Sequence, residues 1–162
     1  ALAAEGALER YAVDFIARRF GEAWDLQAIE VNLRQGGTTH PMMALRAISS
    51  GALDPATGLF LSPTGQPLHY QASDTFSDPA LRGLLPFDLI DIVADADLHY
   101  DPARLRGSVF HLLGCLSEYG KLGMTCVGRS EEEAQAVYEA TAARLLAAGR
   151  AHHAEREQGS LG

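Results

Sequence analysis

The chain has 162 residues, of which 47% are hydrophobic and 21% are charged, an ordinary composition for a folded globular protein. Its formal net charge of −8 is not offset by any block of Lys and Arg, so the composition argues against a nucleic-acid-binding surface. No apolar run approaches the ~18 residues of a membrane span, and no signal peptide is visible. We therefore expect a cytoplasmic protein whose partners are neither nucleic acid nor membrane.

The first third of the chain predicts a β-hairpin followed by a helix. Residues 10–20 and 24–33 are rich in β-branched and aromatic side chains and flank Gly21-Glu22-Ala23, which we interpret as a three-residue turn. Pro41 can begin a helix over MMALRAISSGA (42–52). The segment LFLSPTGQPLHYQ (59–71) predicts a second hairpin around its Pro-Thr-Gly turn.

The second half predicts a helix, two strands and a final long helix. The helix is expected over PFDLIDIVADA (86–96), and the strands over SVFHLLGCL (108–116) and KLGMTCVG (121–128). Ser130 followed by three glutamates is typical of a capping box, and Gly149 is the expected end of the final helix. Because strands and helices are mixed without regular alternation, we expect an α+β domain over 1–149, an antiparallel sheet with flanking helices, and a polar, disordered tail over 150–162.

The second strand of the first hairpin carries an unusual set of polar side chains. Alternation along a strand places Glu30, Asn32 and Arg34 on one face, together with Leu26 and Ala28. A solvated polar face is the simpler interpretation. However, Asn is depleted from strands, and the partner strand holds an acid, Asp14, inside an apolar run, where an ionised carboxylate is costly unless it is paired or coordinates a metal.

The hairpin register suggests why these polar residues occur together. A turn centred on Glu22 places Asp14 opposite Glu30, Ala12 opposite Asn32 and Phe20 opposite Trp24. Directly opposed carboxylates destabilise a sheet unless a cation binds between them. Two carboxylates and an amide carbonyl are hard oxygen donors that suit Mg²⁺ shared with phosphates and water. Asp14, Glu30 and Asn32 are therefore candidate Mg²⁺ ligands.

The residues after this strand are candidates for binding an anion. Arg34 offers a planar, permanently charged fork for a phosphate or carboxylate. Glycine allows the backbone to approach a ligand closely, and the start of a helix favours negative charge. The candidate substrate-binding residues are Gly36, Gly37, Thr38, Thr39 and His40. A plain loop and helix start remains the alternative interpretation of this segment.

Asp14 followed by Glu30-x-Asn32-x-Arg34 resembles the C-terminal catalytic core of the ATP-grasp superfamily of carboxylate–amine ligases. The wider context, VDF…AIEVNLRQGGTTHP, is most similar to bacterial peptide ligases of the pheganomycin-biosynthesis type, and the similarity extends over nearly the whole chain. The resemblance implies that Asp14, Glu30 and Asn32 hold two Mg²⁺ ions that bridge ATP phosphates. It implies that Arg34 steadies the transferred phosphoryl group, and that the product is an amide formed through an acyl phosphate.

The family's nucleotide-binding region has no counterpart in this sequence. There is no Walker A motif, the only lysine is Lys121, and the chain begins at Ala1 without an initiating Met. We therefore expect the C-terminal part of a longer ligase, inactive without the N-terminal nucleotide-binding part of the same protein. Its expected substrates are small-molecule or peptide acids and amines, and a homodimer is left open. The alternative is a non-catalytic ligand-binding or docking module that keeps the fold.

Other reactive side chains predict structural roles. Cys115 and Cys126 lie in apolar surroundings without CxxC spacing, which favours reduced core residues over a disulfide. The six histidines include no pair with the spacing of zinc ligands on a common element, and His111 is interpreted as a core histidine with its hydrogen bonds satisfied. We interpret Glu118-Tyr119-Gly120-Lys121 as a turn in preference to a part of the active site.

Overall fold

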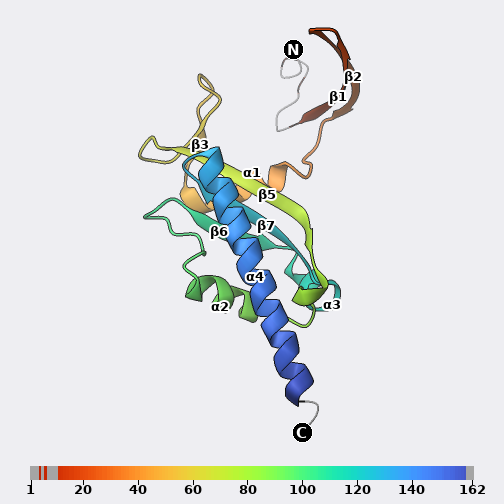
Figure 1. Cartoon of the computed structure of the whole chain (residues 1–162). Helices are drawn as coiled ribbons and strands as arrows, with labels where there is room; N and C mark the ends of the chain where they lie inside the picture. Colours follow the sequence, from red (N-terminus) through yellow and green to blue (C-terminus); the bar gives the residue numbers. More distant parts are fainter. Residues whose placement is uncertain (1–3, 5, 7–10, 160–162) are drawn as a thin grey trace. The chain divides into compact units, whose positions relative to one another are not determined.

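The computed structural model describes residues 4, 6 and 11–159 of the chain. The chain divides into two compact units, Ala1–Met42 and Met43–Gly162, and each is described by itself (Figure 1). Among the described residues, no helix has both the length and the apolar character needed to cross a membrane.

The first unit contains the predicted hairpin. Strands β1 (Ala12–Phe20) and β2 (Ala23–Asn32) pair in antiparallel orientation. The turn between them has two residues, Gly21-Glu22, and Gly21 adopts a left-handed φ of 62°. The predicted three-residue turn is therefore wrong, and so is the pairing of Phe20 with Trp24. Phe20 pairs with Ala23, and Trp24 lies opposite Arg19, whose guanidinium carbon is 5.8 Å from the centre of the indole ring.

The register changes along this hairpin. Near the turn, Phe15 pairs with Ala28, but the next pair is Asp14 with Glu30, which leaves Ile29 as an extra residue in β2. Such a β-bulge shifts the register by one residue and bends the strand. Because of this shift, the predicted pairs Asp14–Glu30 and Ala12–Asn32 are confirmed even though the predicted turn is wrong.

The bulge also decides which side chains share a face. Side chains at directly opposed positions lie on the same face of a hairpin. Asp14 opposes Glu30 and Ile16 opposes Gln27, so Gln27 lies on the face of Glu30, and the prediction that Leu26 and Ala28 share that face is wrong. The opposite face collects a continuous apolar set, Val13, Phe15, Ala17, Leu26, Ala28 and Val31. The bulge therefore makes this face apolar over this stretch, whereas the face of Asp14 and Glu30 carries Ile16 as well as polar side chains.

Helix α1 (Thr39–Ser49) follows the hairpin and continues from the first unit into the second. It begins at Thr39, so Pro41 occupies its first turn, where the missing N–H of proline costs no helical hydrogen bond. At the other end, the Ser49 hydroxyl donates to the Leu45 carbonyl at 2.6 Å and accepts from the Gly51 N–H at 3.1 Å. The expected helix is confirmed, with both boundaries shifted toward the N-terminus.

The second unit is built on a five-stranded antiparallel sheet in the order β3-β4-β5-β7-β6. The strands are β3 (Ala52–Leu53), β4 (Phe60–Leu61), β5 (Pro67–Ser77), β6 (Gly107–His111) and β7 (Lys121–Gly128). The turn predicted between β4 and β5 is present, with the Ser62 N–H donating to the Gln66 carbonyl at 2.9 Å. Together with the helices below, this sheet confirms the predicted α+β class with an antiparallel sheet.

The helices of this unit are η2 (Pro79–Leu81), α2 (Pro86–Asp95), η3 (Leu113–Cys115), α3 (Leu116–Tyr119) and α4 (Glu131–Gly159). Helix α2 matches the predicted segment closely. The strand predicted over 108–116 is wrong beyond His111, because Leu112 adopts a left-handed φ of 56° that turns the chain into η3. The turn predicted at Glu118-Tyr119-Gly120-Lys121 is confirmed, since Gly120 ends α3 in the left-handed conformation.

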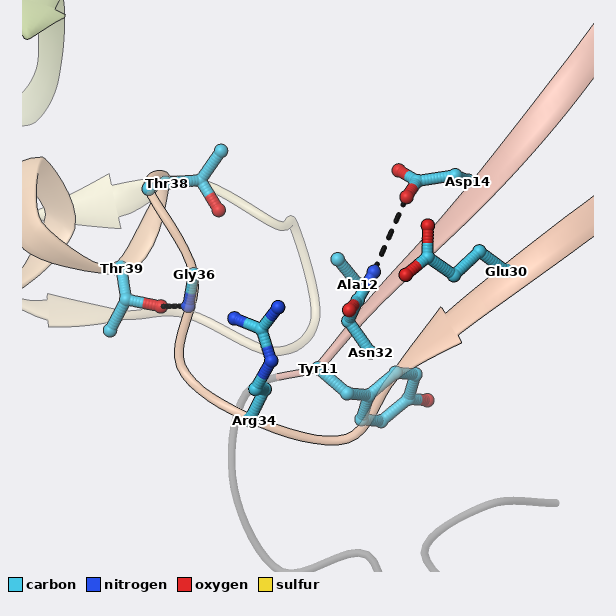
Figure 2. A pocket seen from close by; sticks show the side chains of 10 residues that line it. Tyr11, Ala12, Asp14, Glu30, Asn32, Arg34, Gly36, Thr38 and Thr39 are labelled. Carbon is cyan, nitrogen blue, oxygen red and sulfur yellow. Dashed lines mark hydrogen bonds between the residues drawn. The ribbon is translucent and has the colours of Figure 1, made fainter.

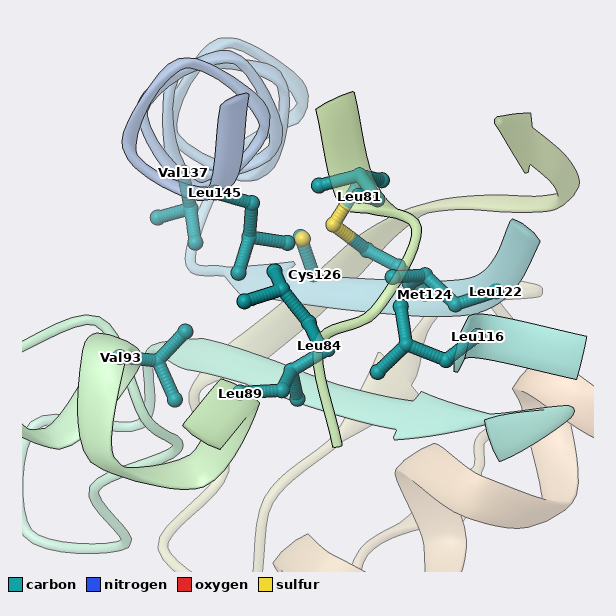
Figure 3. Packing of buried hydrophobic residues seen from close by; sticks show 10 residues of the cluster. All are labelled: Leu81, Leu84, Leu89, Val93, Leu116, Leu122, Met124, Cys126, Val137 and Leu145. Carbon is teal, nitrogen blue, oxygen red and sulfur yellow. The ribbon is translucent and has the colours of Figure 1, made fainter. Parts of the chain in front are cut away.

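One face of the central strand β7 carries the core of this unit. Leu122, Met124 and Cys126 point toward a layer formed by α2, α4 and the segment around η2 (Figure 3). The contributing residues of that layer include Leu81, Leu84, Leu89, Val93, Val137 and Leu145. Both cysteines are free, as predicted. Burial raises the pKa of the Cys126 thiol to about 11, so this side chain behaves as a small apolar core residue.

Helix α4 begins as predicted but ends later. The Ser130 hydroxyl accepts from the Glu133 N–H at 3.1 Å, which confirms the cap, and the Glu133 carboxylate accepts from the Arg129 N–H at 2.8 Å. The end predicted at Gly149 is wrong, because the helix continues to Gly159. A Cβ at Gly149 would lie 2.2 Å from the Ala80 carbonyl oxygen, so this glycine allows α4 to pack closely on η2.

Candidate functional site

Ten residues of the first unit line a pocket with a volume of about 480 Å³ (Figure 2). All of them lie between Tyr11 and Thr39 in the sequence. Of the predicted site residues, the lining includes Asp14, Glu30, Asn32, Arg34, Gly36, Gly37, Thr38 and Thr39. It does not include His40, and it adds Tyr11 and Ala12. The hairpin and the loop before α1 therefore contribute to one concave surface.

The hairpin side of the pocket carries two acids and an amide. Asp14 and Glu30 are opposed across the strands, and Asn32 lies one pair further along the same face. The Asn32 side-chain amide donates to Asp14 Oδ2 at 3.3 Å, and the side chains of all three residues lie close together in Figure 2. Since the amide nitrogen points to Asp14, the hydrogen bond does not use the Asn32 carbonyl oxygen.

This donor set suits only some cations. Within the described part of the chain, no group of three or more His, Cys, Asp or Glu side chains could hold a metal ion. The pocket instead offers two carboxylates and one amide oxygen. Mg²⁺ is commonly bound through one or two carboxylates and completes its octahedral shell with water and substrate phosphates, so these residues fit a shared Mg²⁺ ion.

The loop side of the pocket carries positive charge and backbone donors. The Arg34 guanidinium lies between the hairpin side chains and the Gly36–Thr39 loop in Figure 2, and its Nη1 atom donates to the Gln35 carbonyl at 3.4 Å. The loop leads directly into α1, whose N-terminus carries the positive end of the helix dipole. One end of the pocket therefore suits a cation and the other suits an anion.

Tyr11 and Ala12 were not among the predicted site residues. The predicted register already placed Ala12 opposite Asn32, so pairing was the signal that could have identified it. Tyr11 precedes the first paired residue of β1 and is 44% exposed. Its ring lies beside Asn32 in Figure 2 and extends the wall of the pocket. Nothing in the spacing of the motif indicated this tyrosine.

The second unit contains a separate histidine–carboxylate pair. His111 Nε2 lies 2.7 Å from Asp74 Oδ1, and the His111 side chain is 15% exposed. The ring lies against Gly123, where a Cβ would be 2.2 Å from Nε2. His111 therefore has a hydrogen-bond partner, as predicted, but it lies at the boundary of the core and bridges across β7.

Comparisons with known proteins agree with the family resemblance expected from the sequence. Residues 88–141 match the family described as the PGM1 C-terminal domain. Over 135 residues the chain is 30% identical to the L-propargylglycine–L-glutamate ligase of Streptantibioticus cattleyicolor. The predicted resemblance to a ligase is confirmed. This match covers 83% of the chain but 27% of the ligase relative, so the chain spans about a quarter of that relative's length. No solved structure matches the chain.

The two matches differ in how much of the molecule they cover. The PGM1 C-terminal domain match extends from α2 into α4 and lies wholly within the second unit. The pocket residues, Tyr11 to Thr39, lie outside it. The match to the ligase relative extends over most of the chain and supports membership in a ligase family. Neither match assigns a role to a single pocket residue, so these roles follow from the chemistry of the side chains.

Proposed function

We propose that the chain is the C-terminal part of an ATP-dependent carboxylate–amine ligase that forms an amide through an acyl phosphate. One observation carries the proposal: Asp14, Glu30, Asn32 and Arg34 line the same pocket as the glycine-containing loop before α1. Similarity to the L-propargylglycine–L-glutamate ligase supports it. By analogy with the name of that relative, the proposed substrates are amino acids or peptides, one giving the carboxylate and the other the amine.

The proposed reaction has two steps. An oxygen of the substrate carboxylate attacks the γ-phosphorus of ATP, and ADP leaves. The amine nitrogen then attacks the carbonyl carbon of the acyl phosphate, phosphate leaves, and the nitrogen loses a proton as the amide forms. Phosphoryl transfer of this kind depends mainly on positioning and on neutralising negative charge.

Different pocket residues are proposed to bind the metal, the transferred phosphoryl group and the substrate. Asp14, Glu30 and Asn32 are the proposed ligands of Mg²⁺, with two ions in the complete enzyme, and bound Mg²⁺ supplies charge neutralisation at the ATP phosphates. Arg34 is the proposed catalytic residue, since its guanidinium can hold two oxygens of the transferred phosphoryl group at once. The loop formed by Gly36, Gly37, Thr38 and Thr39 is proposed to hold the phosphate or the acid. His40 directly follows that loop but does not line the pocket, so no contact with the substrate is proposed for it.

Adenine binding is proposed to come from an N-terminal part of the same protein. The chain spans 27% of the ligase relative, and its only lysine, Lys121, belongs to β7 in the second unit. We therefore expect the chain by itself to bind Mg²⁺ and nucleotide weakly and not to turn over. A complete ligase is expected to require both parts.

Calorimetric titration of Mg²⁺ and ATP tests this function. The titration uses the wild-type chain, Glu30→Ala and Asn32→Ala, alone and joined to the N-terminal part of the protein. Both substitutions are expected to weaken Mg²⁺-dependent ATP binding by about tenfold or more, the usual effect of losing a ligand or its support. Glu22→Ala is the matched control, because Glu22 lies in the hairpin turn and is not a pocket residue. Equal binding by all four proteins would contradict the metal assignment and leave the docking-module alternative.

A further inference from the structure

We propose that Thr39 acts as a positioning residue, whose hydroxyl shapes the anion-binding loop and does not itself contact the ligand. This inference rests on the proposed function of the pocket. It changes the role predicted for Thr39 from the sequence, where its hydroxyl was a candidate substrate contact.

Two hydrogen bonds run in opposite directions between Thr39 and Gly36. The Gly36 N–H donates to Thr39 Oγ1 at 3.1 Å, a contact drawn in Figure 2, and the Thr39 N–H donates to the Gly36 carbonyl at 2.9 Å. Together they close a small ring around Gly37 and Thr38. The Thr39 residue lines the pocket but is only 8% exposed.

Gly36 leaves the backbone of this loop accessible from the pocket. A Cβ built on Gly36 meets no atom within 4 Å, so packing does not require glycine at this position. Gly36 is also absent from the glycines with positive φ, so its backbone conformation does not require glycine either. Gly36 lines the pocket, so its lack of a side chain leaves the backbone open to the close approach of a ligand.

These contacts assign different tasks to neighbouring groups. The Gly36 N–H is satisfied by Thr39 Oγ1, so it is not the group that binds the anion. The Thr39 hydroxyl instead fixes the Gly36 backbone and the direction in which Gly37 and Thr38 face the pocket. The charge of the ligand is met by Arg34 and by the positive end of α1, whose placement depends on this closed loop.

Three substitutions separate this role from general packing. Hydrogen exchange of the Gly36 amide without ligand separates it from direct ligand contact, since Thr39→Val speeds that exchange only if the hydroxyl holds the loop. Thr39→Ser keeps the hydroxyl, and Thr39→Val keeps the branched shape but removes the acceptor for the Gly36 N–H. Gly36→Ala leaves the loop hydrogen bonds in place and adds a methyl group at the pocket surface. The probes are Mn²⁺ alone, a substitute for Mg²⁺ that is readily followed by electron paramagnetic resonance, and ADP in the presence of Mn²⁺, followed by calorimetry. Both are applied to the chain joined to the N-terminal part of the protein.

We expect Thr39→Val to weaken ADP binding by about five- to tenfold, the usual effect of one lost hydrogen bond, with Mn²⁺ binding unchanged. Thr39→Ser is expected to restore ADP binding to within about twofold of wild type, since the acceptor is retained. Gly36→Ala is expected to weaken ADP binding without lowering the melting temperature, because its methyl group meets no protein atom.

The outcomes that overturn the proposal differ from those that overturn the function. If Thr39→Ser binds ADP as weakly as Thr39→Val, or if Thr39→Val weakens Mn²⁺ and ADP equally, the positioning role is wrong. If Thr39→Val binds ADP like wild type, the positioning role is also wrong. A wild-type chain that binds neither Mn²⁺ nor ADP when joined to the N-terminal part of the protein would overturn the proposed function itself, and the role of Thr39 with it.

Discussion

Asp14 of β1 lies directly opposite Glu30 of β2, although the two-residue turn that joins these strands would pair Asp14 with Ile29 in a regular ladder. The bulge at Ile29 absorbs one residue and brings the two carboxylates together. Directly opposed like charges destabilise a hairpin. Their occurrence at the one irregular point of the ladder is the strongest structural argument that they serve a ligand.

Deleting one residue from β2 should change Mn²⁺ affinity at one position and leave it nearly unchanged at another. Deletion of Ile29 removes the bulge but keeps Asp14 opposite Glu30, so Mn²⁺ affinity is expected to stay within about threefold of wild type. Deletion of Val31 moves Asn32 to the apolar face, since a shift of one residue reverses every following side chain. That variant should bind Mn²⁺ at least about tenfold more weakly. Similar affinities in both deletions would contradict the observed register.

The opposed carboxylates should cost stability when no cation is bound. In the presence of EDTA, Glu30→Gln is expected to stabilise the hairpin by roughly 0.2–1 kcal/mol, the range for a cross-strand pair. Hydrogen exchange of the β1 and β2 amides measures this local opening. Glu22→Gln, in the turn, is the control and should have no such effect. Greater protection of the wild-type hairpin than of Glu30→Gln in EDTA would show that the two acids do not repel each other.

Gly149 should tolerate no side chain despite its position inside a helix. An exposed Gly-to-Ala change in a helix normally stabilises by about 1 kcal/mol. Here the added Cβ would lie 2.2 Å from the Ala80 carbonyl oxygen, so we expect Gly149→Ala to destabilise by about 1–3 kcal/mol in urea unfolding. Ala147→Gly, at an exposed position of α4, is the control and should cost about 1 kcal/mol. A stabilised Gly149→Ala protein would contradict the close packing of α4 on η2.

The two cysteines should differ in reactivity. Burial raises the pKa of Cys126 from 9.0 to about 11, so near pH 8 its reactive thiolate is scarce in the folded chain. Cys115 is partly exposed. Iodoacetamide at pH 8 is therefore expected to modify Cys115 first, as measured by peptide mass spectrometry. Both cysteines should react in urea, and equal rates without urea would contradict the burial of Cys126.

The raised pKa of Cys126 also predicts a dependence of stability on pH. The folded chain holds the thiol proton more tightly than the unfolded chain, so the favourable contribution is complete below pH 9.0 and is lost as the pH rises through about 11. Cys126→Ala should remove this part of the alkaline loss of stability. Urea unfolding of both proteins at pH 8 and pH 10.5 measures the difference, and equal losses would contradict the assigned cause.

Local sequence signals were sufficient for most elements of the second unit. Helix α2 and strand β7 lie where their apolar patterns predicted, and the Ser130 cap begins α4 as expected. These features depend on neighbouring residues and on the period of the pattern, which are visible in one dimension. The residue types at Asp14, Glu30, Asn32 and Arg34 indicated a candidate site from the sequence, and the structure brings these four residues to one pocket.

Features that depend on contacts between distant segments required the tertiary structure. A glycine in a helical pattern can end the helix or permit close packing, and only the contact of Gly149 with Ala80 distinguishes the two. Alternation along β2 predicted the wrong neighbours for Glu30, because a bulge carries no reliable sequence signal and arises from pairing with β1. The sequence by itself determined which polar and charged residue types the candidate site contains. The tertiary structure decided which side chains share its face, because register is a property of two strands together.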